Sequence, residues 1–267
     1  MSAARPAEGA RPLEGGAEAH EVRKAGGGQH TSAARPAEGA PRAPAARSAR
    51  GVFVAGTDTG IGKTHVAVAL LAAAVAQGRR AVGMKPVAAG LDPGGGEPDD
   101  VARLRAAGNV DADAHARNPY AFAPAIAPHL AAMRAAQRID LDVIASAYAK
   151  LASVSDVVVV EGAGGVLVPL DATRDMLDVP ARLALPVALV VGIRLGCLNH
   201  ALLSALAVRA RGLVLAGFVA NRIDPHMDAA DDNVRALQER LGAPLLADLA
   251  VGATAIDVAA LRAVALV

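Results

Sequence analysis

The residues best suited to chemistry in this chain lie in the stretch 52–64. It reads Val-Phe-Val-Ala-Gly-Thr-Asp-Thr-Gly-Ile-Gly-Lys-Thr, an apolar run followed by a glycine-rich loop (56–64). Glycines let backbone N–H groups turn toward an anion, and a helix that begins near Thr64 would add the positive end of its dipole. Lys63 can reach the outer phosphates of a nucleotide, and the Thr64 hydroxyl can bind Mg²⁺. The loop therefore predicts a binding site for ATP or GTP.

The spacing in this loop differs from the usual phosphate-binding pattern. That pattern has a glycine five positions before the glycine of Gly-Lys-Thr. This chain has Thr57 there, and the nearest glycine is Gly56, so the loop is one residue longer. A glycine-rich turn without a ligand is the alternative interpretation. The position of Gly-Lys-Thr between an apolar run and an alanine-rich stretch argues against it.

Charged residues also follow other apolar runs. Lys85 comes directly after 81–84, where an ammonium group could neutralise charge on a transferred phosphoryl group, although a surface lysine is the alternative. Glu161 ends a run of four valines, and a carboxylate at such a buried position needs a cation such as Mg²⁺. Asp100 follows Asp99 at the start of a predicted helix, where these carboxylates either stabilise the helix N-terminus or bind Mg²⁺.

Three further stretches are candidates for ligand contacts. The stretch 192–200 holds two glycines and Arg194, which suggests an anion contact. Asn221 has an amide that could pair with a purine edge or cap the next turn. The stretch 118–129 holds two of the five aromatic residues, Tyr120 and Phe122, without a helical or strand period, which suggests an ordered loop that forms a substrate wall.

Alternation of apolar runs with helical patterns predicts the elements that must position these residues. Expected strands are Val52–Val54, Ala81–Met84, Val157–Val160, Val187–Val191 and Leu213–Val219. Expected helices span about 64–77, 99–107, 126–136, 140–152, 197–211, 231–241 and 256–264. Continuous apolar strands of this kind are buried on both faces, as in a parallel sheet. The pattern predicts a P-loop NTPase-like α/β fold, a doubly wound, mainly parallel sheet flanked by helices, with ligands at the carboxyl ends of the strands.

Composition divides the chain into two parts. Of the 267 residues 53% are hydrophobic and 20% charged, and Cys197 is the only cysteine, which excludes an intrachain disulfide and favours a cytoplasmic location. Residues 1–50 carry a net charge of +3 and repeat one nine-residue segment, so we expect a disordered, low-complexity N-terminal extension. Residues 51–267 carry a net charge of −2 and form the predicted domain. This charge does not favour nucleic acid as a partner, and no apolar run approaches the roughly 20 residues of a membrane helix.

Seven short motifs occur in one order across about 51–250. They are Gly-Thr-Asp-Thr-Gly-Ile-Gly-Lys-Thr (56–64), Lys-Pro-Val-Ala (85–88), Asn-Pro-Tyr (118–120), Pro-His (128–129), Val-Glu-Gly-Ala-Gly-Gly (160–165), Gly-Cys-Leu-Asn-His-Ala (196–201) and Val-Ala-Asn (219–221). As a set they resemble the dethiobiotin synthetase family, which also has the longer glycine-rich loop. Gly-Lys-Thr alone is generic, whereas the set is highly specific.

The resemblance implies an ATP- and Mg²⁺-dependent ligase of biotin biosynthesis. Such an enzyme carboxylates 7,8-diaminononanoate with CO₂ to a carbamate. ATP then phosphorylates the carbamate to a carbamic-phosphoric anhydride, and the second amine closes the ring to give dethiobiotin, ADP and phosphate. The family is homodimeric, with the substrate site at the subunit interface. Phosphoryl transfer needs mainly positioning and charge neutralisation, which agrees with the little acid–base machinery visible here.

The resemblance also implies roles for individual residues. The catalytic residues would be Lys63 and Lys85, and Mg²⁺ would be held by Thr64, Asp100 and Glu161. Nucleotide contacts would come from Gly60, Ile61, Gly62, Lys63, Thr64, His65, Asp100, Glu161, Gly162, Ala163, Gly164, Asn221 and Arg222. Substrate contacts would come from Thr59, Lys85, Ala89, Arg194, Leu195, Gly196 and Asn199, with the 194–199 loop donated by the second subunit.

Four positions depart from the family pattern. Ala89 stands where a hydroxyl residue is common, so one polar substrate contact is lost or replaced. Arg194 stands where lysine is common, which can preserve the anion contact. Arg222 stands where an acidic residue is common. The segment 250–252 lacks the proline of the family's nucleotide loop, which leaves the purine contacts open.

Other classes of protein share parts of this pattern. An ATPase switch of the ParA/MinD type would bind nucleotide to control assembly, but it typically has a second lysine four positions before Gly62, where this chain has Asp58. A cobyrinate-type amidoligase would need a glutamine-hydrolysing domain, for which we expect no room. A binding protein that has lost catalysis is disfavoured because Lys63, Lys85 and Glu161 are all present.

Overall fold

The computed structural model describes residues 49–91, 96–253, 255–264 and 266. Residues 1–48, which make up most of the expected extension, lie outside the described residues. Arg50, the last residue of the expected extension, is the first residue of a strand. Its backbone N–H donates to the Asp156 carbonyl at 2.9 Å, so strand pairing already includes this position.

A six-stranded sheet forms the centre of the fold, in the order β2-β5-β1-β6-β7-β8. The strands are β1 Arg50–Gly56, β2 Ala81–Met84, β5 Val157–Glu161, β6 Val187–Ile193, β7 Leu215–Arg222 and β8 Leu245–Leu249. All five pairings are parallel. A separate parallel pair joins β3 (Val87–Ala89) to β4 (Tyr120–Phe122). The predicted parallel α/β fold is therefore confirmed.

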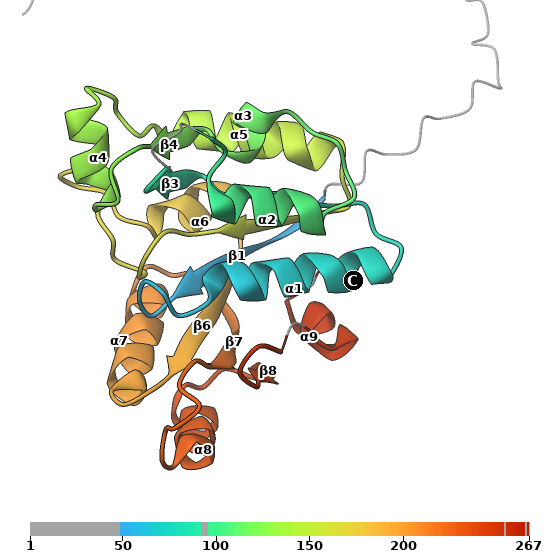
Figure 1. Cartoon of the computed structure of the whole chain (residues 1–267), viewed down its shortest axis with the longest axis vertical. Coiled ribbons are helices and arrows are strands. Elements are labelled where there is room, and N and C mark those ends of the chain that lie inside the picture. The colour runs from blue at the N-terminus through green and yellow to red at the C-terminus, as the bar shows by residue number, and fades with distance from the viewer. Residues whose placement is uncertain (1–48, 92–95, 254, 265, 267) are drawn as a thin grey trace, which may run out of the picture. The chain divides into compact units, whose positions relative to one another are not determined.

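Helices cover both faces of the sheet (Figure 1). They are α1 Lys63–Ala76, α2 Asp99–Ala107, α3 Ala114–Arg117, α4 Pro128–Arg134, α5 Leu141–Ser153, α6 Asp178–Leu183, α7 Cys197–Ala210, α8 Ala230–Arg240 and α9 Val258–Ala263. The apolar side chains of α1 and α9 pack on one face of the sheet, and those of α5, α7 and α8 pack on the other. None of the helices that the structure describes is long and apolar enough to cross a membrane.

Both faces of the central strands are buried, as the continuous valine runs predicted. Val52 and Val54 belong to the core cluster that contains α1, whereas Phe53 belongs to the cluster on the opposite face. In β5, residues 157 and 159 likewise belong to the cluster that contains α1, and residues 158 and 160 belong to the opposite one. Because successive side chains of a strand point to opposite faces, a strand covered on both sides needs an apolar residue at every position.

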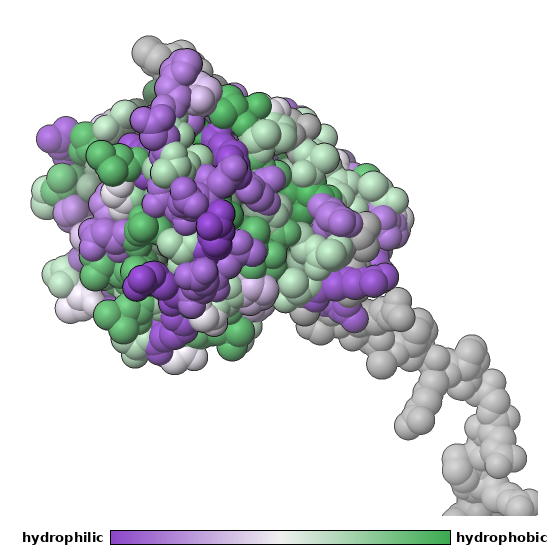
Figure 2. Space-filling model, turned by 90° about the horizontal axis from the view of Figure 1, so that it is seen from below, coloured by the Kyte–Doolittle hydropathy of each residue, from purple (hydrophilic) through white to green (hydrophobic). Residues whose placement is uncertain are grey.

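The surface helix α8 shows the opposite pattern. Its described side chains bury only Val234 and Leu237, while Asp231, Asp232 and Arg235 are exposed. Figure 2 shows the face of the molecule that points downward in Figure 1. On this face the hydrophilic residues form a band, with hydrophobic residues on either side.

Several boundaries differ from the sequence expectation. The helix expected over 126–136 is shorter, because Pro128 occupies its first turn and Ala136 has a positive φ of 49° just beyond its end. The strand expected from Leu213 begins at Leu215. The sequence also gave no indication of the short elements α3, α6, β3, β4 and β8.

Candidate active site

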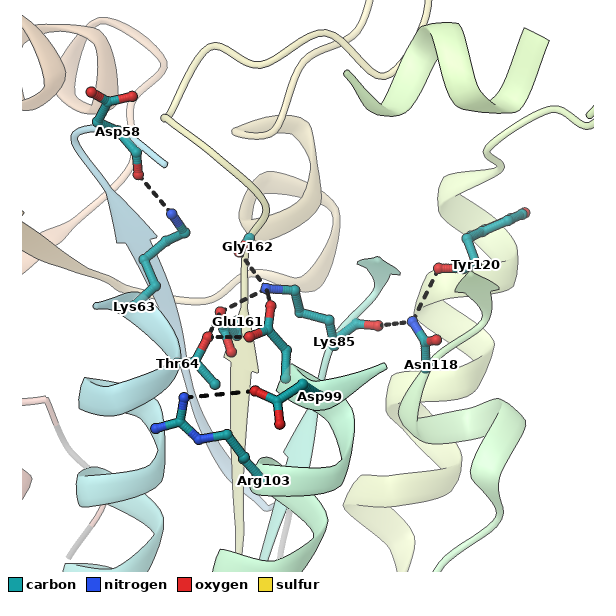
Figure 3. A network of polar contacts seen from close by, with 11 residues as sticks. Asp58, Lys63, Thr64, Lys85, Asp99, Arg103, Asn118, Tyr120, Glu161 and Gly162 are labelled. Carbon is teal, nitrogen blue, oxygen red and sulfur yellow. Dashed lines mark hydrogen bonds and ion pairs between the residues drawn. The ribbon is translucent and has the colours of Figure 1, made fainter. Parts of the chain in front are cut away.

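The glycine-rich loop connects the carboxyl end of β1 to the first turn of α1. Gly62 has a φ of +88°, which favours glycine, and α1 begins at the next residue. The Lys63 side chain folds back along the loop, so that its Nζ donates to the Asp58 carbonyl at 2.7 Å (Figure 3). A Cβ atom at Gly56 would lie 2.7 Å from Lys63 Cδ. Gly56 thus leaves room for the lysine stem.

Lys63 is in an environment that disfavours its charge. Burial, with a contribution from the nearby Lys85 ammonium, lowers the pKa of Lys63 to about 8. An anion placed against the loop would favour the charged form of this side chain. The loop is therefore arranged to gain electrostatic energy when an anion binds.

Lys85 lies at the end of β2, with its ammonium between two carboxylates. Lys85 Nζ is 2.6 Å from Glu161 Oε1 and 2.8 Å from Asp100 Oδ2, and it also donates to the Gly162 carbonyl at 3.3 Å. Burial alone would lower the pKa of Lys85, but Glu161 and Asp100 together raise it above its ordinary value. Lys85 therefore carries a fixed positive charge inside the protein.

The backbone of Lys85 is held by the β3–β4 pair and the residues before it. Asn118 Nδ2 donates to the Lys85 carbonyl at 2.6 Å and to the Tyr120 carbonyl at 3.0 Å (Figure 3). The Lys85 N–H donates to the Arg117 carbonyl at 2.8 Å. The Tyr120 hydroxyl in turn accepts from the Asp140 N–H at 2.8 Å. The stretch 118–122 thus acts as a support for Lys85 more than as a cavity wall.

Thr64, Asp100 and Glu161 converge as the sequence predicted. Thr64 Oγ1 is 2.7 Å from Asp100 Oδ1 and 2.8 Å from Glu161 Oε1. A hydroxyl has one proton and can donate to only one of these oxygens. Glu161 Oε2 is also buried, without a hydrogen-bond partner among the described residues. Oxygen acceptors are therefore in excess of donors here.

This excess of oxygen atoms suits a hard cation. Mg²⁺ is usually bound by one or two carboxylates together with waters and substrate phosphates. Two carboxylates and a threonine hydroxyl at the end of a glycine-rich loop fit that requirement. The residues named for Mg²⁺ could therefore hold it beside the phosphates of a nucleotide.

These residues surround one cavity of about 770 Å³, here called the central cavity. Twelve of its lining residues were predicted as site residues: Thr59, Gly60, Gly62, Lys63, Thr64, His65, Lys85, Ala89, Asp100, Glu161, Ala163 and Gly164. The stretch 125–128, which lies within the expected substrate wall of 118–129, also lines this cavity. The remaining lining residues, Val87, Arg103 and Val168, were not predicted.

Other predicted site residues do not line the central cavity. Gly162 contributes its carbonyl to Lys85, and the Ile61 side chain is buried in the core. Asn221 Nδ2 donates to the Ile61 carbonyl at 2.8 Å. It lies so close to Gly62 that a Cβ atom at that position would clash with it. Arg222 forms ion pairs with two aspartates of α8 and β8. The adenine contact of Asn221 therefore remains a prediction.

The 194–199 loop also lies away from this cavity within one chain. Arg194 contacts Asp58 Oδ2 at 2.5 Å, on the outer side of the glycine-rich loop. The Leu195 side chain is 94% exposed. Gly196 and Asn199, at the start of α7, are likewise not among the lining residues. The expected substrate contact of this loop therefore remains a prediction.

His65 connects the glycine-rich loop to the segment after β8. Its ring Nε2 hydrogen-bonds the Ala253 carbonyl. Ala253 directly follows 250–252, where the family resemblance places the nucleotide loop. His65 therefore has a role in positioning this segment that the sequence did not reveal.

Comparisons with known proteins indicate the family of this chain. A family model described as an AAA domain matches residues 50–252. The ATP-dependent dethiobiotin synthetase of Nitrosospira multiformis is 55% identical over 197 residues, which cover 74% of this chain and 86% of that protein. That of Aromatoleum aromaticum is 53% identical over 199 residues, covering 74% and 88%. That of Xanthomonas euvesicatoria is 49% identical over 194 residues, covering 72% and 87%.

The chain belongs to the dethiobiotin synthetase family. The resemblance found in its motifs is thereby confirmed. Among solved structures, a ParA family ATPase from Chlorobium tepidum is 15% identical, with a TM-score of 0.46, over 81% of this chain and 91% of that one.

In this dethiobiotin synthetase relative, three of the positions expected to depart from the family pattern can be placed in the structure. Arg222 is 2.7 Å from Asp248 Oδ2, so a positive charge at this position is balanced by an acidic neighbour on the adjacent strand. Arg194 is balanced by Asp58. Ala89 lines the central cavity without adding a polar group. The basic side chains at 194 and 222 are thus each paired with an aspartate.

Replacing Lys85 should test the buried charge arrangement. We expect Lys85→Met to lower the free energy of unfolding by about 3 kcal/mol, because Glu161 would remain buried without a cation. Adding Glu161→Gln should recover part of the loss. Urea denaturation would measure both variants, with Lys150→Met, an exposed lysine of α5, as the control. Equal stability of Lys85→Met and the control would contradict this description of the site.

Proposed function

We propose that this protein is an ATP-dependent dethiobiotin synthetase that acts on 7,8-diaminononanoate and CO₂. The convergence of Lys63, Lys85, Thr64, Asp100 and Glu161 on one cavity is the observation that carries the proposal. It is supported by identities of 49–55% to curated synthetases over most of their length. We assign the activity to a single domain, residues 51–267.

In the proposed reaction one amine of the substrate attacks CO₂ and forms a carbamate. The carbamate oxygen then attacks the γ-phosphorus of ATP, which forms a carbamic-phosphoric anhydride and releases ADP. The second amine attacks the carbonyl carbon of the anhydride, and phosphate leaves as the ureido ring closes. Each step develops or moves negative charge on oxygen, which preorganised cations can stabilise.

The chain's own residues would supply these electrostatic contributions. Lys85, held by its two carboxylates, is positioned to stabilise the carbamate and the transferred phosphoryl group. Lys63 would leave the Asp58 carbonyl and turn to the outer phosphates. Mg²⁺, held by Thr64, Asp100 and Glu161, would neutralise phosphate charge. The apolar wall formed by Val87 and residues 125–128 would accommodate the aliphatic chain of the substrate.

We also propose that the protein is a homodimer. Leu195 and Leu206 are well exposed, and Leu167 and Leu203 line a second cavity of about 420 Å³ beside Asp58. Exposed apolar side chains gathered at one place favour a protein interface. A second subunit covering this surface would bring its own 194–199 loop toward the substrate site. The single cysteine, Cys197, is free and buried, which supports our further proposal of a cytoplasmic location.

Activity can be tested by following phosphate release from MgATP and bicarbonate with and without 7,8-diaminononanoate. We expect phosphate release to depend on the diamine and to match the dethiobiotin detected by mass spectrometry, one for one. Hydrolysis without the diamine would favour an ATPase switch, and no hydrolysis would favour a binding protein. Either result would overturn the proposed activity.

The role of Lys85 can be measured in the same assay. We expect Lys85→Met to lower kcat by about 100-fold or more, because a preorganised charge near the transferred group typically contributes that much. The assay must be run below the unfolding temperature of the variant, with Lys150→Met as the control. A kcat equal to that of the control would exclude a direct role for Lys85.

The proposed interface can be tested by placing a charge within it. We expect the wild type to have the mass of a dimer in analytical ultracentrifugation and Leu203→Glu to shift toward the monomer, because the charge would be buried without a partner. Val214→Glu changes another exposed apolar side chain, just before β7, and should leave the mass unchanged. A monomeric wild type would contradict the proposal.

A further inference from the structure

Arg103 is a cation of the central cavity that neither the motifs nor the family resemblance indicated. It lies on α2, three residues after Asp100, so both side chains emerge on the same side of this helix. Helix α2 packs against α1, and Arg103 lines the same cavity as Thr64 and Lys63. Figure 3 shows its side chain extending from α2.

The guanidinium group of Arg103 is less engaged than the other cations of this cavity. Lys85 is bound between two carboxylates, and Lys63 donates to a carbonyl. Arg103 NH1 is 3.9 Å from Asp99 Oδ2, and these side chains are 45% and 82% exposed. An exposed pair at this distance holds its partners weakly, so the guanidinium can turn into the cavity at little cost.

The charges of the cavity also leave a need for a further cation. Lys63 and Lys85 are balanced by Asp100 and Glu161, so these four side chains together carry no net charge. A nucleoside triphosphate brings more negative charge into the same space than one bound Mg²⁺ neutralises. A guanidinium group binds phosphate through two parallel N–H donors, which a lysine cannot supply.

We propose that Arg103 binds the phosphate oxygens of the nucleotide from the α2 side of the cavity. This rests on the ATP-binding part of the proposed function and adds a contact residue to it. The proximity of Arg103 to Asp100, which contacts Thr64 at the end of the glycine-rich loop, favours the phosphates over the carboxylate of the diamine. The diamine is expected along the apolar wall of Val87 and residues 125–128.

Direct binding of MgATP to the full chain tests this contact without turnover. In calorimetry without the diamine, we expect Arg103→Ala to raise the Kd of MgATP about tenfold or more, as loss of a charge-assisted contact does. Arg103→Lys, which keeps the charge but not the paired donors, should lie between Arg103→Ala and the wild type. The matched control is Arg105→Ala on the same helix, because Arg105 is bound to Glu97 and is not a lining residue. Its Kd should equal that of the wild type.

Two outcomes would overturn the inference. The first is a Kd for Arg103→Ala equal to that of the wild type, and the second is an equal loss in Arg105→Ala. In the first case, a raised KM for the diamine would assign Arg103 to the substrate carboxylate. In both cases the wild type still binds MgATP and makes dethiobiotin, so the proposed function stands. Failure of the wild type to bind MgATP would overturn both.

Discussion

The Lys85 ammonium and the Glu161 carboxylate lie 2.6 Å apart inside the protein, and the surrounding structure depends on this ion pair. Lys85 follows Met84 of β2, and Glu161 follows Val160 of β5. Met84 and Val160 lie opposite each other in these neighbouring parallel strands. The register therefore brings the two charges together at the carboxyl edge of the sheet. A buried charge without a partner is costly, so neither residue could be placed there alone.

Much of the structure near this edge serves to keep the pair in position. Asn118 donates hydrogen bonds to the carbonyls of both Lys85 and Tyr120, and Tyr120 is held in turn by the small β3–β4 sheet. Asp100 of α2 contacts both Lys85 and Thr64. Because a network of this kind fixes each charge before a ligand arrives, the site needs little rearrangement when charge develops on a phosphoryl group. The unpaired Glu161 Oε2 and the lowered pKa of Lys63 leave it ready for a cation and an anion, respectively.

The glycine-rich loop is held from several sides by residues distant in sequence. Asn221 of β7 binds the Ile61 carbonyl, and His65 binds the carbonyl of Ala253 after β8. Arg194 contacts Asp58 at the outer side of the loop. The backbone N–H groups that would face phosphates are thus fixed by the ends of three strands and the segments after them, which is the preorganisation that a nucleotide site requires.

The amino-acid sequence by itself determined the parallel α/β fold, the glycine-rich loop and the positions of Lys85 and Glu161. It did so because continuous apolar runs indicate strands buried on both faces, and the residue after each run must lie at one edge of the sheet. It did not predict β3 and β4, each of three residues, because these strands exist only by pairing across about 30 residues of chain. It also missed β8, an edge strand whose partly exposed residues lack a clear pattern. Only the tertiary structure decided that Arg103 lines the central cavity while Asn221 supports the loop, because the side of a helix or strand that faces a ligand is set by packing between distant elements.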